Sequence, residues 1–63
     1  MKLSLRACRV NANLTRQELA DLLGVTVNTI NNWENNNTTP NAQLLIDFAR
    51  VCGVKVENIR LGD

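Results

Sequence analysis

The chain has 63 residues, of which 44% are hydrophobic and 3% aromatic, and its formal net charge is +1. A chain this short buries only about 60% of the surface that its unfolded form exposes, so we expect one domain over residues 1–63, with at most two packed layers. The absence of histidine excludes histidine-dependent catalysis and histidine-based metal sites. The near-neutral charge leaves the class of partner open, because nucleic-acid binders are usually basic.

The sequence has no feature of a membrane or secreted protein. No apolar run approaches the roughly 18 residues that span a bilayer, and the first residues lack the apolar stretch of a signal peptide. We therefore expect a cytoplasmic protein without a membrane partner, a cofactor or a metal. Cys8 and Cys52 do not form a CxxC motif. Because both fall on apolar helix faces, we expect buried, reduced thiols, with a disulfide between them as the alternative.

Hydrophobic periodicity and cap residues predict four helices and a short final turn. The first helix covers about 4–11, with Ser4 as its N-cap. The second begins at a capping box, in which the side chains of Thr15 and Glu18 bind each other's backbone amides. It ends at Gly24, where a left-handed residue closes the helix.

The third and fourth helices are separated by a polar loop. Thr26 caps the third helix, which covers about 27–35. Asn41 caps the fourth helix, which ends at Gly53. Both helices therefore have a cap residue at the start that the amino-acid sequence alone identifies.

A final turn is predicted over about 56–59, with Val56 and Ile59 packed on the core. The only alternation of apolar and polar residues, at 54–56, is too short to predict a strand. The predicted fold is therefore all-α, a compact domain of four to five helices.

The short connection between the second and third helices is the most informative feature. Only Val25 separates Gly24 from the cap of the next helix, so the two helices must cross steeply, as in a helix-turn-helix. Ala20 is small where the helices approach, Gly24 permits a left-handed backbone, and Ile30 fills the space between them. This spacing predicts a helix-turn-helix.

The outer face of the third helix consists of carboxamides. The 3.6-residue period places Ile30 and Trp33 inward, Asn28 and Asn32 outward one turn apart, and Asn31 on the flank. An asparagine offers a donor and an acceptor in one plane, which matches the N6/N7 edge of adenine in the major groove. The alternative interpretation is that these asparagines are merely solvated.

Residues 17–26 (QELADLLGVT), together with Ile30, 33–34 and Pro40, resemble the helix-turn-helix of the Cro and phage-repressor family. Residues 52–56 are similar to a segment near the end of the same family's sequence pattern. The resemblance implies a lambda-repressor-like fold in which helices two and three form the motif. It also implies a transcriptional regulator that acts as a repressor. Such a protein binds double-stranded DNA with an operator-like, palindromic sequence in a sequence-specific way, and it binds as a homodimer.

The resemblance assigns roles position by position. The family contacts bases from the start of the third helix and one turn later, which here gives Val27, Asn28, Asn31 and Asn32. The expected phosphate contacts are Arg16, Gln17, Thr26, Thr29, Asn36, Asn37 and Asn41. The family's buried pair of an arginine and a glutamate is matched by Arg9 and Glu34.

Three positions depart from the family pattern. Arg16 replaces a phosphate-binding glutamine, which keeps the contact and adds a charge. Asn36 replaces a glycine and is the next-best residue for a left-handed conformation. Lys55 stands where a capping serine or aspartate is common, which weakens the predicted start of the last helix.

A protein-binding module on the same fold, such as the antitoxin of a toxin–antitoxin pair, is the main alternative function. The weak net charge favours it slightly. The segment 27–33 argues against it, because this segment has no charge and its polar groups suit base edges. An enzyme is not expected, because Asp21, Asp47 and Glu57 have no spacing that assembles an acid–base pair.

Overall fold

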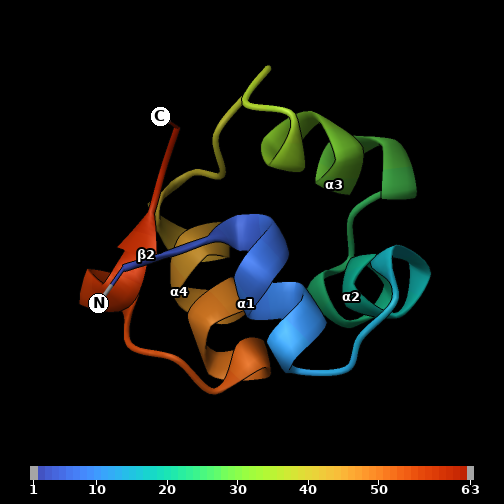
Figure 1. The fold of residues 1–63 in the computed structure, drawn as a ribbon. Coiled ribbons are helices and arrows are strands. Elements are labelled where there is room, and N and C mark those ends of the chain that lie inside the picture. The colour runs from blue at the N-terminus through green and yellow to red at the C-terminus, as the bar shows by residue number, and fades with distance from the viewer. Residues whose placement is uncertain (1, 63) are drawn as a thin grey trace.

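The structure, a computed structural model, describes residues 2–62 and is a bundle of four helices (Figure 1). In chain order the elements are β1 (Leu3–Ser4), α1 (Leu5–Asn11), α2 (Arg16–Leu23), α3 (Val27–Glu34), α4 (Ala42–Cys52), a 3-10 turn η1 (Val56–Asn58) and β2 (Ile59–Arg60). The helix α1 contacts both α3 and α4, and α2 packs against α3 and α4. The predicted all-α class and the order of the four helices are confirmed.

The helix starts lie where the cap residues predict them. Each predicted cap side chain accepts a hydrogen bond from a backbone amide three residues later: Ser4, Thr15, Thr26 and Asn41. The capping box is complete, since the Glu18 amide donates to Thr15 Oγ1 at 3.0 Å and the Thr15 amide donates to Glu18 Oε1 at 2.9 Å. Such a cap stabilises a helix by about 1 kcal/mol relative to alanine.

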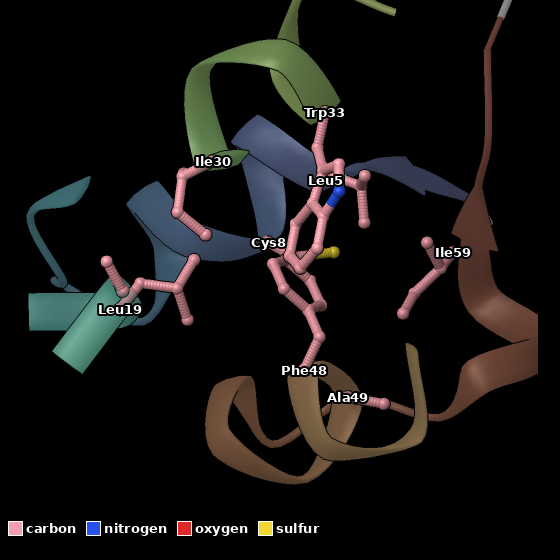
Figure 2. Packing of buried hydrophobic residues seen from close by; sticks show 9 residues of the cluster. Leu5, Cys8, Leu19, Ile30, Trp33, Phe48, Ala49 and Ile59 are labelled. Atoms are coloured by element: carbon pink, nitrogen blue, oxygen red, sulfur yellow. The ribbon is translucent and has the colours of Figure 1, made fainter. Parts of the chain in front are cut away.

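One buried hydrophobic cluster holds all four helices together (Figure 2). Its members are Leu5, Cys8, Leu19, Ala20, Ile30, Trp33, Phe48, Ala49 and Ile59. Phe48 extends from α4 toward Cys8 of α1, and Trp33 extends down from α3 into the same space (Figure 2). Trp33 is thus a core residue, as the helical period predicts, and it fixes the end of α3 on the bundle.

The two short strands were not predicted. β1 and β2 pair in parallel, with Leu3 opposite Ile59 and Ser4 opposite Arg60. A strand of two residues has no alternating pattern to detect, and the pairing arises only because the fold brings the two ends of the described chain together. The segment 54–56 is not a strand, as expected.

The last turn corrects one expectation about the core. Ile59 is buried, as predicted, but Val56 is 41% exposed and does not pack inside. The last helical element is only the three residues of η1, and Lys55 at its start makes no side-chain cap. The start of this turn therefore lacks the stabilisation that a cap side chain gives, and the chain enters β2 directly after Asn58.

Both cysteines are free thiols, so the alternative of a disulfide is wrong for this structure. Cys8 is buried, whereas Cys52 is only partly buried. Burial raises the pKa of both thiols, that of Cys52 to about 11. Both therefore stay protonated and unreactive near neutral pH.

Candidate nucleic-acid interface

The turn between α2 and α3 has the backbone that a helix-turn-helix requires. Gly24 ends α2 with φ of 71°, in the left-handed region that disfavours any residue with a Cβ. The Val25 amide then donates to the Ala20 carbonyl at 3.0 Å. Ala20 and Ile30 are buried where α2 meets α3. The inner face of α3 is thereby fixed on α2, and its outer face stays in solvent.

The four expected base-contacting residues occupy two adjacent rows on α3. Asn28 is exposed and Asn32 is half-buried, and these two lie one turn apart. Val27 and Asn31 are half-buried, and both line an open hollow of about 690 Å³ at the start of α2. The structure therefore exposes Asn28 most and turns Val27 and Asn31 toward α2.

Asn32 has a neighbour that sequence reasoning missed. The backbone amides of Asn37 and Thr38 donate to the Asn32 carbonyl at 2.9 and 3.4 Å, which folds the following loop onto the end of α3. Asn37 Nδ2 also lies 3.5 Å from Asn32 Oδ1, a distance at the limit of a hydrogen bond. This weak contact leaves the Asn32 amide able to take a stronger partner.

The expected phosphate-contacting residues divide into three groups. Arg16 and Gln17 begin α2, Thr26 and Thr29 begin α3, and Asn36, Asn37 and Asn41 lie between α3 and α4. Arg16 and Gln17 line the same hollow as Val27 and Asn31, and neither the second nor the third group contributes to it. Asn36 has φ of 62°, the left-handed conformation expected where the family has glycine.

Several of these polar side chains are already hydrogen-bonded within the chain. Gln17 Nε2 donates to Asp21 Oδ1 at 2.8 Å, and the hydroxyls of Thr26 and Thr29 lie 2.9 Å apart. Asn41 Oδ1 accepts from the Leu44 amide at 2.8 Å as the cap of α4. A ligand would therefore meet side chains held in place by short local hydrogen bonds.

The ion pair expected between α1 and α3 is present in the structure. Arg9 Nε lies 2.6 Å from Glu34 Oε2, and its Nη2 lies 3.3 Å from Glu34 Oε1. The remaining nitrogen, Nη1, donates to the Leu14 carbonyl at 2.9 Å. The side chains are only 10% and 4% exposed, so the pair is largely removed from solvent.

Arg16 is a second partner of the same carboxylate. Its Nε lies 3.2 Å from Glu34 Oε1, and its side chain is 44% exposed. The sequence-based role of Arg16 was a phosphate contact alone, and the structure adds an ion pair to it. Neither residue type nor spacing pointed to this contact, because the two residues meet only through the packing of α2 and α3.

The segment of the chain that follows α2 carries almost no charge. Between Asp21 and Asp47 the only charged residue is Glu34, and its side chain is buried between two arginines. Any partner of α3 would therefore meet amides and hydroxyls, with Arg16 as the cation at the edge of the hollow. Among residues 2–62 no cluster of three metal-ligating side chains occurs, and no helix is long and apolar enough to cross a membrane.

The helix-turn-helix family model matches residues 5–59, which extend from the start of α1 to the start of β2. No curated protein matches the chain.

Proposed function

Because the chain belongs to the helix-turn-helix family of Cro and the phage repressors, we propose that it is a transcriptional repressor that reads DNA with α3. The observation that supports this proposal most is the uncharged carboxamide face of α3, placed beside the start of α2 and the exposed Arg16. Such a face suits base edges in the major groove, and a flanking cation suits the DNA backbone. Its DNA partner would place the protein in the cytoplasm.

In this proposal the contacts divide into two kinds. Asn28 and Asn32 bind adenine edges through their amides, and Val27 packs against a thymine methyl group. Asn31 contacts a base from the flank of the helix. The backbone amides at the starts of α2 and α4 and the polar side chains around them hold phosphates, which fixes the register of α3 in the groove.

The direct test is selection of binding sites from a pool of randomised duplexes, followed by affinity measurements on the selected duplex and on a scrambled one. We expect a preference of at least about a thousandfold, as is typical of specific DNA-binding proteins. AT-rich DNA upstream of the protein's own gene is a second probe. Binding to neither selected nor upstream DNA would contradict the proposal.

The dependence of binding on salt should be moderate. The cations available for phosphates are Arg16 and one or both of Lys2 and Arg6, all exposed, whereas Arg9 is buried with Glu34. With roughly two or three charged contacts per subunit, a dimer should give a slope of log affinity against log salt of about −4 to −5. Arg16→Gln should flatten this slope by about one per subunit on every sequence tested. If the effect of Arg16→Gln depended on sequence, Arg16 would be contacting a base.

We also propose that the protein binds as a two-fold dimer. A single short helix contacts only a few base pairs, so two copies of α3 should contact half-sites about 34 Å apart. Val56 and Leu61, which lie before and after β2 in the chain, are 41% and 42% exposed, and in this proposal they supply the small apolar contact between copies. Because that surface is small, we expect a monomer or weak dimer without DNA, measured by sedimentation. A footprint covering one unrepeated half-site would refute the dimer.

The near-neutral net charge keeps one other function open as a competing proposal, a protein-binding module such as an antitoxin. The same salt titration separates the two. A slope near zero, with no preference for any duplex, would support the protein-binding module.

A further inference from the structure

The carboxylate of Glu34 binds two arginines in unequal ways. Arg9 contacts both of its oxygens, and all three nitrogens of Arg9 donate within the protein. Arg16 contacts one oxygen, through Nε alone. Within residues 2–62 the structure gives the two terminal nitrogens of Arg16 no partner. Every nitrogen of Arg9 thus has a partner, whereas Arg16 retains four N–H donors on Nη1 and Nη2.

The charges of Arg9, Arg16 and Glu34 also distinguish the two arginines. Two guanidinium groups and one carboxylate leave one positive charge uncompensated. Arg9 is 10% exposed and Arg16 is 44% exposed, so the excess charge lies on the solvent side of the cluster. Arg16 is also the first residue of α2 and lines the open hollow with Gln17, where the helix start offers backbone amides.

We infer that Glu34 is a positioning residue for the DNA backbone, because it holds Arg16 by Nε and thereby presents Nη1 and Nη2 to a phosphate at the start of α2. This inference rests on the proposed DNA-binding function. A free arginine would have to be immobilised on binding, and the ordering of such a side chain lowers affinity several-fold. Glu34 orders it beforehand.

The planar fork of arginine is essential to this arrangement. Its guanidinium can donate to the buried carboxylate with one nitrogen and to a phosphate with two others. A lysine has a single nitrogen, which would have to serve both acceptors. Arg16→Lys therefore keeps the charge and removes the positioning, and Arg16→Gln removes both.

The experiment measures affinity across a range of salt concentrations for the parent, Arg16→Lys and Arg16→Gln, on the duplex chosen by selection with the parent. Arg16→Lys should weaken binding about three- to tenfold per subunit without changing the salt slope. Arg16→Gln should weaken binding and also flatten the slope by about one per subunit. Arg16→Lys that binds as tightly as the parent would overturn the inference, with the DNA-binding proposal left intact.

A second comparison separates positioning from a purely structural role. DNA affinity is measured for the parent, Glu34→Gln, Arg16→Gln and the double variant, at a temperature where circular dichroism shows all four proteins folded. The comparison gives the effect of Glu34→Gln with and without Arg16. Glu34→Gln should weaken DNA binding in the parent and have no further effect in the Arg16→Gln background. Equal weakening in both backgrounds would overturn the inference. A parent that binds no duplex would overturn the proposed function itself, and the inference with it.

Discussion

Replacing Glu34 by alanine should lower the free energy of unfolding by about 3–5 kcal/mol, the cost of leaving a buried charge without its partner. Arg9 would keep its hydrogen bond to the Leu14 carbonyl, but alanine offers no carboxylate to its Nε and Nη2. Arg9 and Arg16, which now share Glu34 Oε1, would also repel each other. At roughly 0.05–0.15 kcal/mol per residue, a protein of 63 residues has a total stability of about 3–9 kcal/mol, so this variant should be close to unfolded.

The measurement is urea denaturation followed by circular dichroism, with Glu57→Ala as the matched control. Glu57 is an exposed glutamate on η1, so its replacement should change the free energy of unfolding by less than about 0.5 kcal/mol. If Glu34→Ala unfolds at the same urea concentration as the parent, the pair contributes nothing to stability and the ordering of α1 against α3 must come from the core alone.

Replacing Asn32 by alanine should weaken binding to the preferred duplex by about 1–3 kcal/mol, the usual contribution of a bidentate contact to a base. The fold should tolerate the change, because the loop after α3 is held by the backbone carbonyl of Asn32, which alanine retains. Within the protein, the substitution removes the weak hydrogen bond that the Asn32 side chain accepts from Asn37. Binding to random-sequence DNA should be nearly unchanged, because phosphate contacts dominate it.

Asn35→Ala is the control for Asn32→Ala. Asn35 is an exposed asparagine that follows the last residue of α3 and has no assigned base contact. Affinities on the selected and random duplexes are measured by fluorescence anisotropy for both variants. An equal reduction of affinity on the two duplexes in Asn32→Ala would show that Asn32 does not determine specificity.

The sequence by itself determined the features that depend on residues close together in the chain. Cap residues and the glycines that end α2 and α4 act over three or four positions, so they could be identified before any tertiary contact was known. The helix-turn-helix followed from the same kind of short spacing. The helical period places Ile30 and Trp33 on the inner face of α3 and so identified its outer face, whose side chains are partly or fully exposed in the structure.

Only the tertiary structure decided the contacts between segments far apart in the chain. The pairing of β1 with β2 joins residues near the two ends, and two residues per strand leave no pattern to detect. Val56 could not be recognised as exposed, because an apolar residue in a short turn has no period to fix its direction. Arg9 and Arg16 share Glu34 because α1, α2 and α3 converge there. The packing of these helices, and not the spacing of the residues in the chain, determines which arginine remains exposed to solvent.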